Sequence, residues 1–270
     1  MSAQKGYLYE ANASKTGKPL GITDGTYDGS KNQGPDVVLY KKVSKNKLLK
    51  AGCELKIMPT AAGSLVMQYR DGKWNYGPTD GDEDKEFLKK LGQDNDVLDR
   101  MNKGEWKGIV PNLQYDKQGS KFYSGKHTPA SAYKADQKLF GKSYGGVGDI
   151  YIPIESSKIA NYYITKGDFY MSVGTHGFYI LKDIFNLNES LRIKIPKFSD
   201  CITAKIRIRY QDKTSSESKS KGQANYQFAL TMQFSRVTES PYHLFPVMSK
   251  ENVNINNRKV SKELVNVFKK

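Results

Sequence analysis

The chain has 270 residues, and its 43 Lys and Arg against 28 Asp and Glu give a formal net charge of +15. This length is enough for one large domain or two small ones. Two distant cysteines, Cys53 and Cys201, form neither a disulfide framework nor a zinc cluster, so we expect a reducing, cytoplasmic compartment. The first residues lack the apolar run of a secretion signal, and no window holds the roughly 20 apolar residues of a membrane span. These features exclude a secreted disulfide scaffold, a membrane protein and a collagen-like chain, and favour a soluble basic protein.

The positive charge predicts a polyanionic partner, and nucleic acid is the expected one. The chain has 18 Tyr and 11 Phe, and they are interleaved with Lys and Arg, as in KFYSGKH (121–127) and KIRIRY (205–210). Lysine and arginine would bind phosphates, while aromatic rings either stack on bases or pack in the core. An anionic membrane surface or solubility alone are the alternative explanations for the charge.

The first half of the chain predicts a helix and two strand pairs. Its expected elements, in order, are a helix over 2–15, an exposed loop over 16–35, strands over 36–43 and 48–58 joined by a turn at 44–47, a hairpin of 64–70 and 74–77 turning at Asp71-Gly72, and one or two helices over 82–104 with a break near Gly92.

The second half is richer in strands. Its expected elements are a short amphipathic stretch over 131–146, a strand over 149–154, a glycine-capped helix over 155–167, two strands within 168–181, further antiparallel strands over 191–195, 201–212 and 224–237, a polar loop over 212–223, and a tail from Asn252 with weak helical character. The predicted fold class is therefore α+β.

The stretch GPDVVLYKKVSKNKLLKAGCELKI (34–57) carries the most chemical information. Pro35-Asp36 opens one predicted strand, and Glu54-Leu55-Lys56 lies in the next. Two antiparallel strands joined by a short turn can bring Asp36 and Glu54 together at one end of a sheet, where paired carboxylates suit Mg²⁺. Lys56 lies on the same strand face as Glu54 and could orient an attacking water or counter charge on a phosphate.

This pattern resembles the signature of the PD-(D/E)XK, or restriction-endonuclease-like, nucleases. The resemblance implies a mixed sheet flanked by helices and Mg²⁺-dependent phosphodiester hydrolysis, with Mn²⁺ as a substitute and Asp36, Glu54 and Lys56 in the roles just given. It further implies a metal-binding or catalytic role for Glu10 on the preceding helix, and a supporting role for Gln68 on the following strand.

The resemblance covers roughly residues 5–75, and it also suggests a domain arrangement. We expect a nuclease core over 1–115 and a mainly antiparallel, DNA-binding β extension over 116–270, unless the two form one integrated domain. The segment TKGDFYMSVGTHGFYIL (165–181) is similar to phage-encoded restriction-type endonucleases, although no residue in it receives a role. A phage-encoded enzyme would act in the cytoplasm of its host, and cutting both strands of DNA would favour a homodimer.

Basic residues on two predicted strands are candidate DNA contacts. Lys205, Arg207 and Arg209 alternate with isoleucines, which predicts one basic strand face and one apolar face. Arg192 and Lys194 in LRIKI (191–195) receive the same role. The alternative for such a basic face is simple solvation.

The expected activity is that of a Mg²⁺-dependent endodeoxyribonuclease acting on double-stranded DNA. A non-enzymatic nucleic-acid-binding protein, a virion structural protein and a nuclease selective for junctions or flaps are the alternatives. At the residue level, the competing interpretation is that Asp36 caps a loop while Glu54 and Lys56 form a solvated pair on an exposed face.

Overall fold

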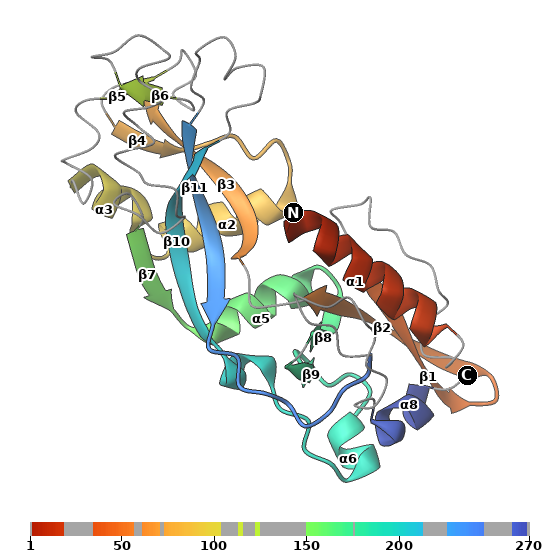
Figure 1. The fold of residues 1–270 in the computed structure, drawn as a ribbon. Helices are drawn as coiled ribbons and strands as arrows, with labels where there is room; N and C mark the ends of the chain where they lie inside the picture. Colours follow the sequence, from red (N-terminus) through yellow and green to blue (C-terminus); the bar gives the residue numbers. More distant parts are fainter. Residues whose placement is uncertain are drawn as a thin grey trace. The chain divides into compact units, whose positions relative to one another are not determined.

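The computed structural model describes residues 2–18, 35–56, 61–70, 73–103, 113–115, 122–124, 150–174, 176–212, 226–245 and 261–268. The fold is α+β, as predicted, and contains two curled sheets with helices (Figure 1). The chain divides into two compact units. Unit 1 comprises Met1–Thr60, Glu155–Ala204 and Phe234–Lys270, and unit 2 comprises Ala61–Ile154 and Lys205–Gln233.

The units are interleaved along the chain, whereas the sequence predicted a nuclease core over 1–115 followed by an extension over 116–270. Long-range strand pairing explains the difference, because strands from the start of the chain find their partners far along it. A single cut near residue 115 therefore does not describe how this chain divides.

Unit 1 is built on a four-stranded mixed sheet. Its strands are β1 (Val37–Ser44), β2 (Lys47–Lys56), β8 (Asp168–Val173) and β9 (Gly177–Ile180), in the order β1-β2-β8-β9. The β1–β2 and β8–β9 pairs are antiparallel, while β2 and β8 are parallel. The predicted hairpin of 36–43 and 48–58 is confirmed as β1 and β2, although residues 57 and 58 fall outside the description.

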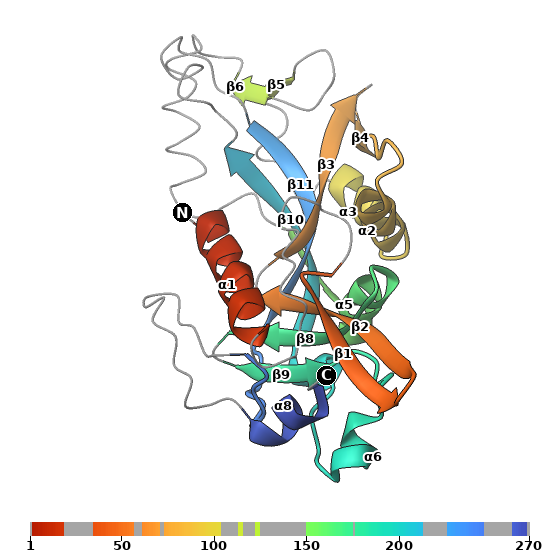
Figure 2. The ribbon, with the colours of Figure 1, turned by 90° about the vertical axis from the view of Figure 1, so that its right-hand side faces the viewer.

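Helices lie on both faces of this sheet. Figure 2 shows α1 (Ser2–Gly17) on one side of β2 and β8, and α5 (Ser156–Thr165) on the other. Tyr9 and Ala13 of α1 join the main apolar core with residues of the strands and of α8 (Lys262–Phe268). The predicted glycine cap of α5 is confirmed at Gly167, whose φ is 88° and whose N–H bonds to the Ile164 carbonyl at 3.0 Å.

Unit 2 contains the second sheet. Its strands run in the order β4 (Lys73–Tyr76), β3 (Ala61–Arg70), β11 (Tyr226–Ser235), β10 (Thr203–Asp212) and β7 (Ile150–Ile154). A further strand, β6 (Phe122–Ser124), pairs with β11 and also with β5 (Leu113–Tyr115). Two helices, α2 (Glu83–Gln93) and α3 (Val97–Lys103), lie beside β3 and β4 and confirm the predicted broken helix. Arg70 pairs with Lys73, as the predicted two-residue turn requires.

The predicted strand over 191–195 is wrong. The segment follows a short helix, α6 (Leu187–Leu191), and Arg192 takes a left-handed conformation with φ of 53°. The Asp183 carboxylate accepts hydrogen bonds from the N–H groups of the first residues of α6, at 2.9 and 3.2 Å. The side chain of Asn188 bonds to both the N–H and the carbonyl of Ile195. These local bonds satisfy the backbone and take the place of a strand ladder.

Several expectations fall wholly or largely on residues outside the description, namely most of the loop over 16–35, the Asp71-Gly72 turn, the stretch over 131–146 and the polar loop over 212–223. Among the helices that the structure describes, none is long and apolar enough to cross a membrane. Both cysteines are buried and free.

Candidate metal site

The register of β1 and β2 brings the predicted carboxylates to one place. Val37 pairs with Cys53 in this antiparallel ladder, so that the preceding residue, Asp36, stands across from Glu54. The Leu55 N–H donates a hydrogen bond of 2.7 Å to Oδ2 of Asp36, which ties the end of one strand to the other. The register therefore places Asp36 opposite Glu54, as their spacing in the sequence predicted.

Glu54 and Lys56 form a buried ion pair. Their side chains meet through Lys56 Nζ and Glu54 Oε1, and they are only 6% and 24% exposed. The ammonium also lies 5.7 Å from the ring centroid of Tyr163 on α5. The competing interpretation of a solvated pair on an exposed face is wrong, because Glu54 is buried and Lys56 is only partly exposed.

Asp168 is a third acidic residue of this region, and the sequence analysis missed it. It opens β8 directly after Gly167 and pairs with Gly52 of β2, two residues before Glu54. Asp168 is fully buried, and within the part of the chain that the structure describes neither carboxylate oxygen has a hydrogen-bond partner. An aspartate at the head of a mostly apolar strand, DFYMSV, is the sequence signal that could have pointed to it.

Gly52 makes room for this arrangement. A Cβ atom at Gly52 would collide with the Gly167 carbonyl oxygen and lie 2.6 Å from Cβ of Pro35. Only a residue without a side chain lets the Gly167 turn and the Pro35-Asp36 segment approach β2 this closely. Gly52 therefore brings the segments that carry Asp36 and Asp168 close to the strand that carries Glu54.

Burial and neighbouring charges shift the pKa values of three of these residues. Burial raises the pKa of Asp36 to about 7, with Glu54 adding to the effect and Lys56 opposing it. Burial also raises the pKa of Asp168 well above its usual range, again helped by Glu54 and then by Asp36. Burial would lower the pKa of Lys56, but Glu54 and then Tyr163 and Asp36 raise it instead, so the ammonium form is strongly favoured.

Two further predicted site residues, Glu10 and Gln68, belong to different units. Glu10 lies on α1 and is half-buried, and it raises the pKa of Asp36 less than burial and Glu54 do. It is thus near enough to influence Asp36. Gln68 is buried on β3 of unit 2, and its supporting role stays a prediction.

Some of these carboxylates are suitable ligands for a hard divalent cation. In the described ranges no three His, Cys, Asp or Glu side chains surround one point as a ready-made metal cage. Mg²⁺ does not need such a cage, because it commonly binds one or two carboxylates and keeps several waters. Asp36 and Glu54, with the buried oxygens of Asp168 nearby, provide the oxygen ligands that this ion prefers.

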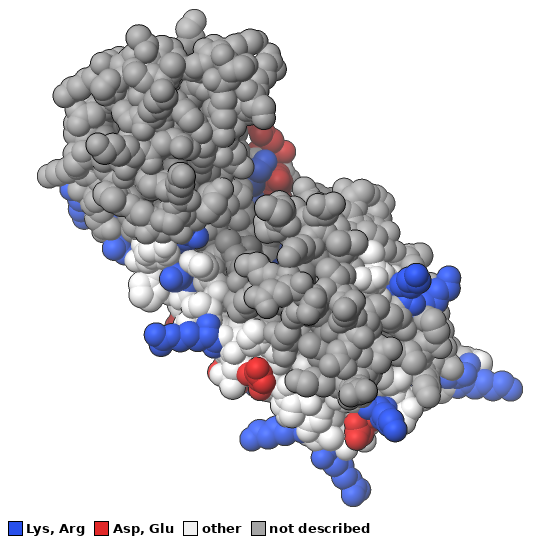
Figure 3. Space-filling model, in the orientation of Figure 1, with Lys and Arg blue, Asp and Glu red and all other residues white. Residues whose placement is uncertain are grey.

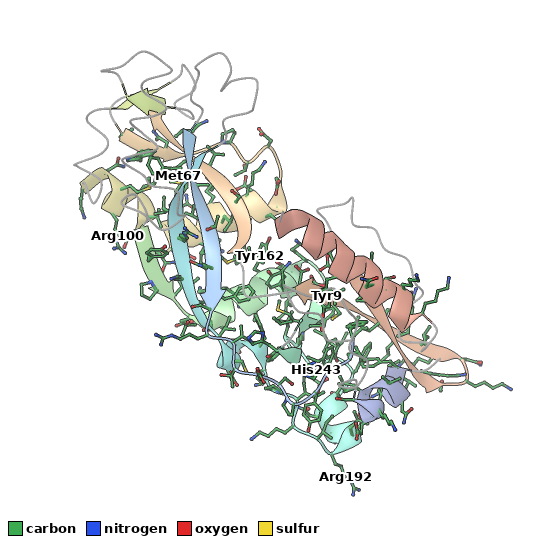
Figure 4. All side chains as sticks on the ribbon, in the orientation of Figure 1. Tyr9, Met67, Arg100, Tyr162, Arg192 and His243 are labelled. Atoms are coloured by element: carbon green, nitrogen blue, oxygen red, sulfur yellow. The ribbon has the colours of Figure 1, made fainter. Side chains whose placement is uncertain are left out.

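The predicted DNA contacts fall into two groups. Arg192 and Lys194 are exposed, and Figure 4 shows Arg192 projecting outward beyond α6. Arg207 is only 7% exposed. Its guanidinium carbon lies 5.8 Å from the ring centroid of Tyr151, and the Lys205 ammonium lies 4.2 Å from the same centroid. Lys205 and Arg207 therefore lie on one side of the strand, as the alternation predicted, but Arg207 is almost fully buried, and its contact with DNA stays a prediction. The side chain of Arg209 is not among those described.

The described surface is nevertheless basic. On the face drawn in Figure 3, lysine and arginine side chains project at many places, with fewer acidic groups between them. This distribution agrees with the net charge of +15 and would attract a polyanion without marking its path.

Comparisons with protein-family models, with curated proteins and with solved structures find no significant match to this chain.

Proposed function

We propose that this chain is a Mg²⁺-dependent endodeoxyribonuclease of the PD-(D/E)XK type. The observation that carries the proposal is the meeting of Asp36 and Glu54 across β1 and β2, with Lys56 on the same face as Glu54. Carboxylates supply ligands for a hard cation, and a lysine beside them supplies positive charge where a phosphate would react.

Each residue has a separate task in this proposal. Asp36 and Glu54 would hold the cation, which supplies Lewis acidity and lowers the pKa of a bound water. Lys56 would orient the attacking water and stabilise the extra negative charge on the scissile phosphate. Its ammonium form is favoured by its carboxylate neighbours, which suits the second task well. Glu10 would assist from α1 through its influence on Asp36.

The fold supports the same proposal. A mixed sheet with helices on both faces is the architecture that the resemblance implies, and the signature residues lie on its two adjacent strands. The basic character of the chain fits a nucleic-acid substrate. Double-stranded DNA is the proposed substrate, and a homodimer is the proposed route to cutting both strands.

Supercoiled plasmid gives the direct test. We expect the protein to nick or linearise it in Mg²⁺ or Mn²⁺ but not in EDTA, and expect Asp36→Ala and Lys56→Ala each to lose at least about 100-fold in rate. Lys42→Ala is the matched control for the lysine change, because Lys42 is exposed on β1. Glu189→Gln, at an exposed position on α6, controls for the loss of an acidic group.

The main alternative is a non-enzymatic nucleic-acid-binding protein. It predicts that the plasmid is shifted on a gel but stays intact under every metal, and that Asp36→Ala binds DNA as the parent does. Stable assembly into large particles without turnover would instead favour a virion component. Preference for branched over linear DNA would identify a structure-selective nuclease.

A further inference from the structure

The outer half of the β1–β2 hairpin extends beyond the rest of its sheet. The pairing of β2 with β8 begins at Gly52, so among the described strands the preceding residues of β2 have only β1 beside them. Figure 2 shows the two strands projecting from unit 1 to a two-residue turn at Lys45-Asn46. The hairpin therefore ends as a two-stranded ribbon, and we call residues 43–48, at its end, the ribbon tip.

The part of the ribbon below the tip is anchored to unit 1. The ammonium of Lys41 donates a hydrogen bond of 2.6 Å to the Phe185 carbonyl. Leu49, which pairs with Lys41 across the two strands, packs against the main core. The ammonium of Lys50 lies 5.6 Å from the ring centroid of Tyr40. These contacts hold the strands in place, so a ligand of the tip meets a surface that is already ordered, which lowers the cost of binding.

The tip combines exposed aliphatic and cationic side chains. Val43 and Leu48 are 52% and 43% exposed, and they are two of the three large apolar side chains that are exposed in the described parts of the chain. Lys45 and Lys47 are exposed as well, and within those same parts the side chain of neither makes an ion pair or a hydrogen bond. The sequence has no acidic residue over 37–53. Such a surface is complementary to a polyanion that also offers apolar contacts.

Duplex DNA is the polyanion that fits this shape. The major groove of B-DNA is about 12 Å wide and admits a two-stranded β-ribbon. Phosphates line both edges of the groove, where lysines bind them, and thymine methyl groups lie within it, where aliphatic side chains make contact. A membrane surface is a poorer match, because interfacial segments typically present a longer apolar face with aromatic residues, and the tip has two aliphatic side chains and no aromatic one.

We infer that the ribbon tip binds the major groove of duplex DNA. This inference rests on the DNA substrate of the proposed function and gives that substrate a contact surface away from the candidate metal site. Leu48 and Glu54 lie on the same face of β2, because side chains alternate along a strand. Their separation is about 20 Å at roughly 3.3 Å per residue, which is the length of about six base pairs. One duplex is therefore long enough to contact the tip and reach the candidate site together.

Binding of a short fluorescent duplex to the full-length chain in EDTA tests the inference without cleavage. Fluorescence anisotropy is measured over a range of salt for the parent, for Lys45→Ala with Lys47→Ala, and for Val43→Ser with Leu48→Ser. We expect the lysine pair to weaken binding by at least about tenfold and to flatten the slope of log affinity against log salt by about 1.8, or about 0.9 for each lost phosphate contact. The aliphatic pair should weaken binding roughly tenfold with an unchanged slope, because it removes no charge.

Three matched variants separate a local contact from general attraction. Lys182→Ala with Lys197→Ala removes the same charge at exposed positions of unit 1 and should leave the slope unchanged. Asp200→Asn, at an exposed aspartate of unit 1, raises the net charge and should leave the slope unchanged too. Lys45→Arg with Lys47→Arg keeps the charge of the tip and should retain both the affinity and the slope.

The outcomes that would overturn the inference are definite. Equal affinity and slope in the parent and in Lys45→Ala with Lys47→Ala would do so, as would an equal loss in Lys182→Ala with Lys197→Ala. Binding of the parent to phosphatidylserine vesicles but not to duplex DNA would overturn it in favour of a membrane surface. The tip positions are exposed, so these variants should fold as the parent does, which circular dichroism checks. If the alanine pair does not fold, Lys45→Gln with Lys47→Gln is measured in the same way and decides the matter.

The two proposals fail in different ways. DNA binding that depends on the ribbon tip, without cleavage in any divalent metal, would support the groove contact and refute the nuclease. Metal-dependent cleavage with unchanged DNA binding in Lys45→Ala with Lys47→Ala would support the nuclease and refute the groove contact.

Discussion

Three carboxyl groups and one lysine determine the electrostatic character of the candidate site. Burial and the charge of Glu54 raise the pKa of both Asp36 and Asp168, and Lys56 counters part of this negative charge. A site with more buried negative than positive charge is unstable by itself and becomes stable when a cation or protons bind. At the scale of single residues, the proposed cation site would therefore lower the stability of the folded chain while it is empty.

The stability of the metal-free protein should depend on pH through Asp36. Its pKa is about 7 in the folded chain against an ordinary value of 3.8, so the folded state holds the proton more tightly. The free energy of unfolding should therefore fall as pH rises from about 4 through about 7. Urea unfolding in EDTA at pH 5 and pH 8 measures this fall. Asp36→Asn should show a smaller fall than the parent, and an unchanged one would contradict the assignment.

Lys56 should stabilise the folded state chiefly by neutralising Glu54. Replacing one partner of a largely buried pair leaves the other charge uncompensated, so Lys56→Met should lower the free energy of unfolding by roughly 1–3 kcal/mol. Adding Glu54→Gln to Lys56→Met should recover most of this loss, which urea unfolding of the double-mutant cycle measures. Lys42→Met, at an exposed site on β1, should cost little. Additive effects of the two changes would argue against the pair.

Secondary-structure elements explain which part of the site the sequence could predict. Asp36 and Glu54 lie on strands joined by a short turn, and the register of such a hairpin follows from its length and its apolar alternation. The parallel pairing of β2 with β8 joins segments that are far apart in the chain. Local patterns contain no information about that pairing, so Asp168 could be recognised as unusual but not placed beside Glu54.

Local hydrogen bonding explains the failure at residues 191–195. The alternation in LRIKI is typical of a strand, but Asp183 and Asn188 bond to the neighbouring backbone and support a short helix followed by an irregular segment. Arg192 and Lys194 do not lie on a strand, but both are exposed. Their role as phosphate contacts therefore stays a prediction.

Gly52 should be intolerant of even the smallest side chain. Gly52→Ala would place a methyl group against the Gly167 carbonyl and Pro35, and we expect a loss of about 1–3 kcal/mol in the free energy of unfolding. Chemical denaturation measures the loss, with Lys47→Ala as an exposed control in the same strand. Wild-type stability in Gly52→Ala would show that β2 and the Gly167 turn are not packed as closely as described.

The two units of the molecule are interleaved, and this has consequences for how the chain folds. The mixed sheet of unit 1 needs β8 and β9, which follow the whole continuous segment Ala61–Ile154 of unit 2. The sequence predicted most strands and helices of both units, although it missed α6, β5 and β6, and it could not show that the second unit is inserted into the first. Composition changes mark loops and tails more readily than they mark strands that pair across an insertion.

A fragment of residues 1–115 should therefore not fold alone. It contains α1, β1 and β2 but lacks β8, β9 and α5, so one edge of β2 and one apolar face would be exposed. Circular dichroism during heating should show a cooperative transition for the full chain and none for the fragment. A cooperative transition of the fragment would favour the predicted sequential domains.

The most direct test of the central claim compares two aspartates in one assay. The rate of plasmid nicking in Mg²⁺ is measured under single-turnover conditions for the parent, Asp36→Asn and Asp200→Asn, with DNA binding recorded for each. The account predicts that Asp36→Asn still binds DNA but nicks it at least about 100-fold more slowly, while Asp200→Asn matches the parent. Equal nicking by Asp36→Asn and the parent, or no nicking by the parent in any divalent metal, would contradict the proposed nuclease site.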